Sequence, residues 1–490
     1  MTTKTKKIKV KREATLLEAL IPVIATVAIL MYTILPVFGV EGEVHIPLIL
    51  GALVGVLVAV YRMGYTWQDI ETGIISSIGG TMQAIIILAI IGMIIGTWIL
   101  GGIVPTLIYY GLQVLSPGIF LFATLILCSI VSMATGSSWT TAGTVGIALM
   151  GVGAGLGINP AMTAGAIISG AYFGDKMSPL SDTTNLAPAM AGSTLFDHIK
   201  HMVYTTGVSY VIAAAGFIFL GFGYAGKALD TASINEILDL MSQNFNINPI
   251  LLLVPIIVIV MVAMKAPAIP GLFVGTLLGG VAALTFQGAT MGDVLNAMQN
   301  GVTSETGNAV LDTLLSRGGL QSMMWTISLI MCALTFGGVL EKTGMLESIA
   351  KRVLKYAKST GSLVTVTILT SIFANVLAGD QYLSIVLPGK MYKEEYHRRG
   401  LAPRNLSRCL EDAGTLTSPL VPWNTCGATM STYLGIPTVE YIPYCFLNLV
   451  NPLVSIVFGF TGITMMKLVN DPSAPEYTGP KVKGSKNISA

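Results

Sequence analysis

A short polar stretch, GDKMSPLSDTTN, interrupts an otherwise apolar part of the chain at residues 174–185. It holds two Asp, a Lys, two Ser, two Thr and an Asn, between the runs TAGAIISGAYF and LAPAMAG. Carboxylate, hydroxyl and amide oxygens are the ligands that hard cations prefer, a rule for calcium and magnesium that we extend to sodium. A charge at the centre of a bilayer costs about 2.5–3.5 kcal/mol on insertion scales. We therefore interpret Asp175 and Asp182 as candidate ion-site carboxylates.

The composition indicates an all-α polytopic membrane protein. The 490 residues are 53% hydrophobic and only 11% charged, whereas soluble proteins carry roughly a quarter charged residues. Spanning segments that avoid free backbone polar groups in lipid are helices. The first apolar stretch, Leu16–Gly39, follows the basic sequence MTTKTKKIKVKR and is longer than the roughly 7–15 residues of a signal-peptide core. We expect it to be the first span, with the basic tail in the cytoplasm.

The chain repeats itself. IPLILGALVGVLVAVYRMGYTWQDI from Ile46 is matched by IPGLFVGTLLGGVAALTFQGATMGDV from Ile269. Later, SIVSMATGSSW corresponds to SIFANVLAGDQ, and GDKMSPLSDTTN corresponds to GTLTSPLVPWNT. Ordered matches of this kind are typical of transporters built from two related halves. The predicted units are a tail, a first repeat, a linker, a second repeat and a second tail, at 1–13, 14–224, 225–246, 247–467 and 468–490.

Lys and Arg set the predicted topology. The loops expected after Leu340 and around Lys390 are rich in both, whereas their counterparts at 103–116 and 151–159 carry no charge. The positive-inside rule places the basic loops in the cytoplasm and their counterparts outside, so the repeats are inverted. Both termini are then cytoplasmic and the linker is extracytoplasmic. The expected spans lie near 16–39, 45–63, 81–102, 159–192, 198–224, 249–266, 268–287, 320–342, 405–436 and 440–466.

Four places resist a continuous helix, because glycine and proline interrupt them. They lie at 135–138, 174–184, 378–380 and 414–422 and form two pairs related by the repeat. Two of them fall in the further elements 118–150 and 361–390, each of which is either a re-entrant hairpin or a pair of full spans. Broken helices at matched positions of two halves are the best sequence indication of a transporter's binding site.

Three of these stretches resemble one family. GAYFGDKMSPLSDTTNLAP at 170–188, GSSWTTAGTVG at 136–146 and EDAGTLTSPLVPWNTCG at 411–427 are similar to the NhaC family of sodium/proton antiporters. The resemblance implies a fold of inverted repeats with hairpins and broken helices, and exchange of sodium for protons. Relatives with very similar motifs exchange malate and protons for lactate and sodium. It also implies a bacterial or archaeal cytoplasmic membrane, and leaves open whether the chain forms a homodimer.

The resemblance implies that Asp175 and Asp182 are sodium ligands. Thr415 and Pro422 stand at the equivalent positions of the second half, so an acid from that half must be Asp380, Glu411 or Asp412. The candidate set for cation and proton binding is Asp175, Asp182, Ser178, Ser181, Thr183, Thr184, Asn185, Ser137, Ser138, Asp380, Asp412, Thr417, Ser418 and Asn424.

Several neighbouring residues have alternatives that the sequence leaves open. Lys176 either pairs with an acid or is a direct ligand. Glu411 and Asp412 are either site acids or the cytoplasmic mouth of the path. We expect a solvated rim at the start of the span near 198–224, formed by Asp197, His198, Lys200 and His201.

We expect sodium and protons to compete for one carboxylate while the two halves rock between the faces. No cofactor is expected beyond the transported sodium ions and protons, and the partners are those ions and membrane lipid, with no nucleic acid. No G-x-x-x-x-G-K-[ST] sequence is present, so an ion gradient is the natural energy source. The alternatives are a sodium-coupled organic-anion exchanger of the malate/lactate type, a channel, and an intramembrane enzyme. For an enzyme, the four His and five Cys show no nucleophile–base or metal-ligand spacing.

Overall fold

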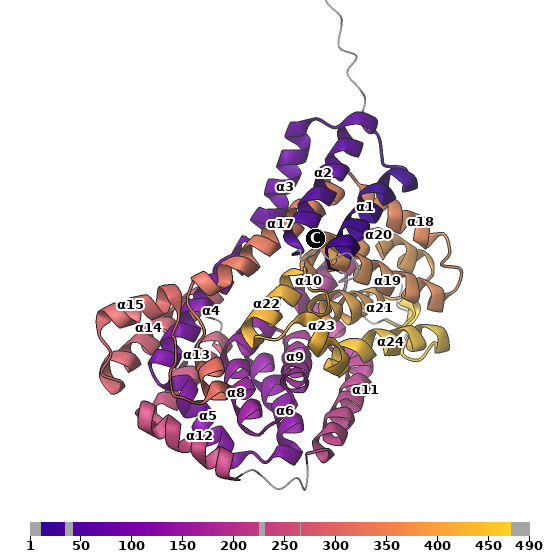
Figure 1. The fold of residues 1–490 in the computed structure, drawn as a ribbon. Helices are drawn as coiled ribbons and strands as arrows, with labels where there is room; N and C mark the ends of the chain where they lie inside the picture. The colour runs from indigo at the N-terminus through magenta and orange to yellow at the C-terminus, as the bar shows by residue number, and fades with distance from the viewer. Residues whose placement is uncertain (1–10, 35–42, 225–230, 265, 472–490) are drawn as a thin grey trace, which may run out of the picture.

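The computed structural model describes residues 11–34, 43–224, 231–264 and 266–471, and these are almost entirely helical (Figure 1). The only β pairing among them is an isolated bridge between Leu401 and Lys467. By length and composition, eight described helices could cross a membrane, or up to ten if each of two bent helix pairs forms one span. The predicted all-α, multi-pass membrane fold is therefore confirmed.

The described residues of the first half form eleven α-helices. They are α1 (Leu16–Ile34), α2 (His45–Arg62), α3 (Trp67–Gly80), α4 (Met82–Leu100), α5 (Ile103–Val114), α6 (Pro117–Thr135), α7 (Ser138–Thr141), α8 (Ile147–Gly155), α9 (Pro160–Met177), α10 (Asp182–Ala191) and α11 (Leu195–Phe222). A π-helical turn, Ala142–Gly146, joins α7 to α8. Between the halves lies α12 (Thr231–Asn244), within the predicted linker.

The described residues of the second half form twelve α-helices. Its helices are α13 (Leu253–Ala263), α14 (Ala268–Phe286), α15 (Met291–Asn300), α16 (Ala309–Leu315), α17 (Met324–Lys342), α18 (Met345–Leu354), α19 (Thr360–Ala378), α20 (Gln381–Arg398), α21 (Pro403–Leu410), α22 (Thr425–Leu434), α23 (Thr438–Tyr441) and α24 (Phe446–Thr461). Two short helical turns, Glu411–Thr415 and Ser418–Leu420, connect α21 to α22.

Two pairs of helix caps recur at positions that the sequence repeat matches. Thr66 and Asp69 form a capping box at the start of α3, and Thr290 and Asp293 form the same box at the start of α15. A left-handed glycine ends α6 and another ends α19, with φ of 67° and 65° respectively. Such caps satisfy backbone groups that a helix end leaves free. The opposite orientation of the halves, and the domain boundaries, stay predictions.

Three predicted loops are wrong in detail, because charge content was taken as a guide to loop structure. Residues 103–116, expected as an uncharged loop, form α5, and the basic stretch after Leu340 contains α18. The basic region around Lys390 lies within α20. In each case an apolar face packs on the bundle, which stabilises a helix whatever its charge. Parts of the tails, of the linker and of the first span, at 1–10, 472–490, 225–230 and 35–39, lie outside the described residues.

The breaks predicted at 174–184 and 414–422 are present. The span predicted at 159–192 is two helices, α9 and α10, and the one at 405–436 is α21, two short turns and α22. The span at 440–466 is also bent, by 59° between α23 and α24. These segments lie near the middle of the view in Figure 1, between α2 and α3 at the top and α5 and α12 at the bottom.

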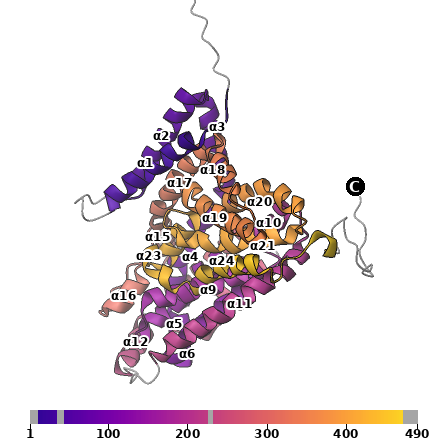
Figure 2. The ribbon, with the colours of Figure 1, turned by 90° about the vertical axis from the view of Figure 1, so that its right-hand side faces the viewer.

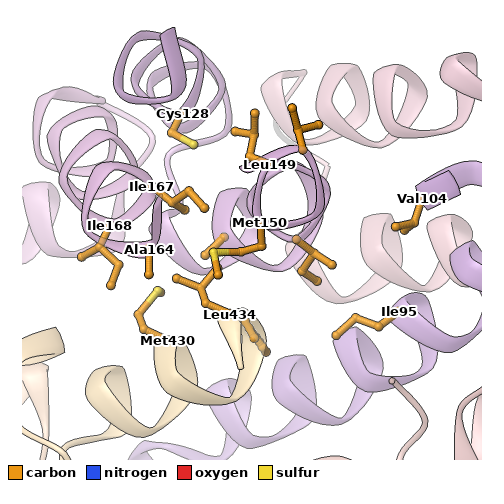
Figure 3. Close-up of a cluster of buried hydrophobic side chains, with 14 of the residues drawn as sticks. Ile95, Val104, Cys128, Leu149, Met150, Ala164, Ile167, Ile168, Met430 and Leu434 are labelled. Carbon is orange, nitrogen blue, oxygen red and sulfur yellow. The ribbon is translucent and has the colours of Figure 1, made fainter. Parts of the chain in front are cut away.

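Close helix packing holds the first break in place. An added Cβ at Gly174 on α9 would lie 2.4 Å from the backbone nitrogen of Met133 on α6, so only glycine fits there. Figure 3 shows the neighbouring apolar core, where Ile167 and Ile168 lie near Met430 and Leu434 of the other half. Turned by 90°, the fold shows α11 and α24, the last long helices of the two halves, side by side (Figure 2). The site described next is therefore built on closely packed helices.

Candidate functional site

A cavity of about 730 Å³ lies where the two halves meet. The ends of α6, α9 and α10 contribute from the first half, and the start of α20 contributes from the second. Among the described lining residues, the three charged side chains are all carboxylates, and none is Lys, Arg or His. The polar and charged lining residues are Thr81, Gln83, Thr135, Ser137, Ser138, Asp175, Ser181, Asp182, Thr183, Asp380, Gln381 and Thr425, with the aromatic rings of Trp139 and Tyr382 beside them.

We call α6–α8 the first hairpin and α19–α20 the second, each with its tip at the break that follows α6 or α19. Asp175 lies where the tip of the first hairpin meets the break between α9 and α10. Only 7% of the residue is exposed, and its Oδ2 accepts hydrogen bonds from the backbone nitrogen of Ser138 at 3.2 Å and from its hydroxyl at 2.7 Å. Ser138 is the first residue of α7, and Ser137 caps that helix. Helix N-termini favour negative charge because their free N–H groups point outward. The carboxylate is thus fixed at the edge of the cavity by the hairpin tip.

Gly136 allows this approach. It has φ of 67°, and an added Cβ would lie 2.7 Å from the carbonyl carbon of Leu180 and 2.9 Å from the nitrogen of Ser181. The backbone of the hairpin tip therefore contacts the backbone of the loop between α9 and α10. A side chain at this position would push the two segments apart and move Ser138 away from Asp175.

The polar residues of the first break divide into two roles. Thr184 donates to the carbonyls of Asp175 and Lys176 at 3.2 and 2.9 Å, so it satisfies acceptors that the end of α9 leaves free. Asn185 is exposed, and its amide donates to the carbonyls of Pro179 and Ser181. Ser178 is buried outside the cavity lining. By contrast Ser181, Asp182 and Thr183 line the cavity, and Asp182 is exposed within it.

Asp380 is the cavity's acid from the second half. It caps α20 by accepting from the backbone nitrogen of Leu383 at 3.0 Å, and its other oxygen accepts from Thr81 at 3.3 Å. Its place at the tip of the second hairpin, after Gly379, corresponds to that of Ser137 after Gly136. The two hairpin tips thus present different chemistry to the same cavity, hydroxyls on one side and a carboxylate on the other.

Three predicted site residues of the second break bond within the protein and do not line the cavity. Asn424 caps α22 and donates to the backbone and side-chain oxygens of Asn375, both at 3.1 Å. Thr417 accepts from Asn375 at 3.0 Å and donates to the carbonyl of Ala413. Ser418 donates to the carbonyl of Thr415 at 2.7 Å. These contacts attach the second break to α19 and satisfy its backbone.

Asp412 lies outside the cavity, in a buried polar cluster. Both it and Lys176 have side chains that are 0% exposed, and the Lys176 ammonium donates to Asp412 Oδ1 in an ion pair. The same oxygen accepts from Asn451 at 2.7 Å and from Thr205 at 3.1 Å, while Arg408 Nε lies 3.8 Å from Oδ2. Of the two roles left open for Lys176, pairing with an acid is therefore the one observed. The pair joins α9 of the first half to the second break.

Glu411, next to Asp412, is also completely buried, so neither of them is a solvated mouth. Among the described residues, neither carboxylate oxygen of Glu411 has a hydrogen-bond partner within standard distance. The charges of Lys176 and Asp175 interact electrostatically with the Glu411 carboxyl. A buried carboxyl with no close donor is destabilising unless the group is protonated or hydrated.

The predicted solvated rim at the start of α11 is wrong for its two histidines. His198 and His201 are 0% and 3% exposed, because α21 packs over them. His198 Nδ1 lies 2.8 Å from the Ser407 hydroxyl, and His201 Nε2 lies 3.2 Å from both the Asn405 side chain and Arg408 Nη1. This contact could not be predicted from local sequence, since about 200 residues separate the partners.

Sequence reasoning missed several residues of the cavity. Thr81, Gln83 and Tyr382 line it, together with Trp139, Gln381 and Thr425. A signal existed for three of them, because Trp139, Gln381 and Thr425 lie within or beside the stretches singled out at the breaks. Thr81 and Gln83 begin α4, far from any break in the sequence, and only the folded chain brings them there. In the described part of the chain no group of three or more His, Cys, Asp or Glu is arranged as a metal site.

Comparison with known proteins matches this architecture to one family. The model of the Na⁺/H⁺ antiporter family covers residues 170–463, more than half of the chain and both broken helices. An Na⁺/H⁺ antiporter NhaC of Alkalihalophilus pseudofirmus is 44% identical over 88% of this chain and 93% of that protein. The chain belongs to the Na⁺/H⁺ antiporter family.

Other members of the family differ in what their names say they carry. A malate-2H⁺/Na⁺-lactate antiporter of Bacillus subtilis is 41% identical over 85% of this chain and 89% of its own length. An arginine/ornithine antiporter ArcD of Halobacterium salinarum is 37% identical over 94% of each chain. All three relatives are named as antiporters and none as an enzyme. Membership of this family therefore establishes that the protein is a multi-pass membrane transporter. Which solutes it carries has to be inferred from the cavity.

Proposed function

We propose that this protein exchanges sodium for protons across the cytoplasmic membrane, with Asp175 as the carboxylate at which the two ions compete. The observation that carries the proposal is the position of Asp175 at the junction of the first hairpin tip and the first break, facing a cavity with acidic and no basic lining among the described residues. Relatives named Na⁺/H⁺ antiporter NhaC support sodium and protons as the exchanged ions.

Competition follows from the chemistry of a single carboxylate. The ionised group can ligate sodium, whereas the protonated group has lost the charge that attracts the ion. Asp182, Ser137, Ser138, Ser181 and Thr183 surround Asp175 in the cavity and supply further oxygens, the ligand type that hard cations prefer. Binding of one ion therefore excludes the other, and no resident cofactor is needed.

Alternating access is the second part of the proposal. Sequence stretches recur in the two halves, so that α14 is the counterpart of α2 and α17 is the counterpart of α4. α2 packs on α17, and α14 packs on α4, so the same contact between helices is made in both directions. This reciprocal packing supports a two-fold relation, and the basic residues around α18 and α20 support an inverted one with both termini in the cytoplasm. We propose that the halves move against each other about the cavity, which alternately faces the two sides.

A second candidate cargo is an organic cation. Three carboxylates together with the rings of Trp139 and Tyr382 suit an ammonium or guanidinium group, and about 730 Å³ is within the usual size range of small-molecule sites. The relative named as an arginine/ornithine antiporter makes this candidate worth testing. Organic anions of the malate or lactate type fit less well, because the nearest buried cation, Lys176, is bound to Asp412.

Proteoliposomes that contain the purified protein and a pH-sensitive dye test the proposal. Sodium added outside should move protons without any organic solute, and Asp175→Asn should abolish this movement. Asp293→Asn is the matched control, because Asp293 is an exposed capping acid in the other half and does not line the cavity. Proton movement that requires arginine or ornithine would favour the second candidate. Proton movement that requires malate or lactate would refute both cation proposals.

A further inference from the structure

A second, apolar cavity of about 200 Å³ lies between α18, α19 and α20. Its described lining residues are apolar except for Thr370, and they include Leu369 and Ala374 of α19. The one hydroxyl among them, that of Thr370, lies 2.6 Å from the hydroxyl of Tyr392 and is therefore satisfied within the protein. A cavity without a free polar group suits a hydrocarbon occupant, because water there would lack hydrogen-bond partners.

The helix over this cavity is amphipathic. Met345, Leu346, Ile349 and Ala350 form the buried face of α18, and its last turn is basic. Buried apolar residues on one face and exposed basic residues on the other are typical of helices that lie in the membrane interface. We therefore place α18 at the boundary between hydrocarbon and headgroups.

Two of the basic side chains at the end of α18 have no acidic partner in the described part of the chain. Lys351 bonds to Glu347 at 3.1 Å and approaches Glu13, whereas Arg352 and Lys355 are exposed without such a pair. The corresponding helix of the first half, α5, has the sequence IVPTLIYYGLQV and carries no charge. The basic residues at the end of α18 are therefore not a feature that the two halves share.

We propose that this cavity and the basic end of α18 form a binding site for one anionic phospholipid. An acyl chain enters the cavity past Leu369, which is half exposed, and the phosphate is held by Arg352 and Lys355. Arg and Lys bind phosphate oxygens through charge-assisted hydrogen bonds. The positive-inside rule would place α18 at the cytoplasmic leaflet, where anionic lipids attract basic segments. The proposal does not depend on which ions the protein transports.

Thermal unfolding of the purified full-length protein in detergent tests the site. Phosphatidylglycerol and phosphatidylcholine with identical acyl chains are added at equal concentration, and the apparent Tm is measured. We expect phosphatidylglycerol to raise the Tm by several degrees more than phosphatidylcholine does. The double variant R352Q/K355Q should lose most of that difference while still responding to phosphatidylcholine. Lys200→Gln, which removes an exposed charge from α11, is the matched control and should behave as the wild type.

A cavity-filling variant tests the acyl-chain half of the site independently. Ala374→Leu adds bulk to a residue that lines the cavity and is 2% exposed, and it should weaken the response to both lipids without changing the preference for phosphate. Inorganic phosphate alone should have no effect on the Tm. Equal responses of the wild type to the two lipids, an unaltered preference in R352Q/K355Q, or stabilisation by inorganic phosphate would each overturn the proposal.

Discussion

The buried ion pair between Lys176 and Asp412 should stabilise the contact between the two halves, and each of its charges should be destabilising once the other is removed. Both side chains are 0% exposed. Removing one partner of a buried pair typically costs about 3–5 kcal/mol of unfolding free energy, because an uncompensated charge remains. Replacing both with apolar side chains of similar volume removes the charge as well as the partner and is often nearly neutral.

The surroundings of the two groups set where each single variant falls in that range. In Lys176→Met, Asp412 keeps the hydrogen bonds from Asn451 and Thr205, and Arg408 lies 3.8 Å away. In Asp412→Leu, the Lys176 ammonium keeps no other hydrogen bond to the described residues. We therefore expect Lys176→Met to cost about 3 kcal/mol and Asp412→Leu about 5 kcal/mol, with most of the larger loss recovered in the double variant K176M/D412L.

The free energy of unfolding can be measured by titrating the protein in mixed micelles with SDS. Glu347→Gln is the matched control, because its ion pair with Lys351 is about half exposed and such surface pairs contribute about 0–1 kcal/mol. Losses in the single variants that simply add in the double variant would refute the pairing. A larger cost for Lys176→Met than for Asp412→Leu would refute the assignment of the remaining hydrogen bonds.

Three further outcomes test the cavity and the surface. Ser138→Ala removes a 2.7 Å hydrogen bond to Asp175. Because hydrogen bonds to charged groups contribute about 1.5–3 kcal/mol, the sodium concentration for half-maximal exchange should change about tenfold or more. An unchanged concentration would contradict the role of Ser138 in positioning Asp175. Gly136→Ala strains a left-handed residue by about 1–2 kcal/mol and separates the hairpin tip from the break. It should therefore lower both the Tm and the exchange rate. A wild-type exchange rate would argue against the contact between Gly136 and the loop at Leu180 and Ser181. The Lys11 ammonium beside Asp69 holds the pKa of that carboxyl well below its usual range, with help from the capping residue. Because a depressed pKa gives stability that is present above the unfolded pKa and lost as pH falls, Asp69→Asn should reduce the drop in Tm between about pH 5 and pH 2, and an equal drop would show that the cap does not contribute.

Much of the architecture follows from local sequence. Low charge and long apolar runs require helices in lipid, and Gly and Pro that cluster together disfavour a continuous helix. The breaks at 174–184 and 414–422 were therefore predictable, as were the matched capping boxes at Thr66 and Thr290. The role of Asp175 at the candidate site also rests on its position in a break, which the sequence contains.

Tertiary structure alone decided which polar atoms face the cavity and which are used within the protein. Asp412 and Asp380 are both acids near a break, yet one pairs with Lys176 and the other lines the cavity beside Thr81. His198 looks like an exposed residue at a helix start until α21 covers it. Each outcome depends on contacts between segments about 200 to 300 residues apart. The sequence determined which groups could bind an ion. Long-range packing determined which of these groups already bond to another residue of the protein, because buried polar groups are nearly always hydrogen-bonded.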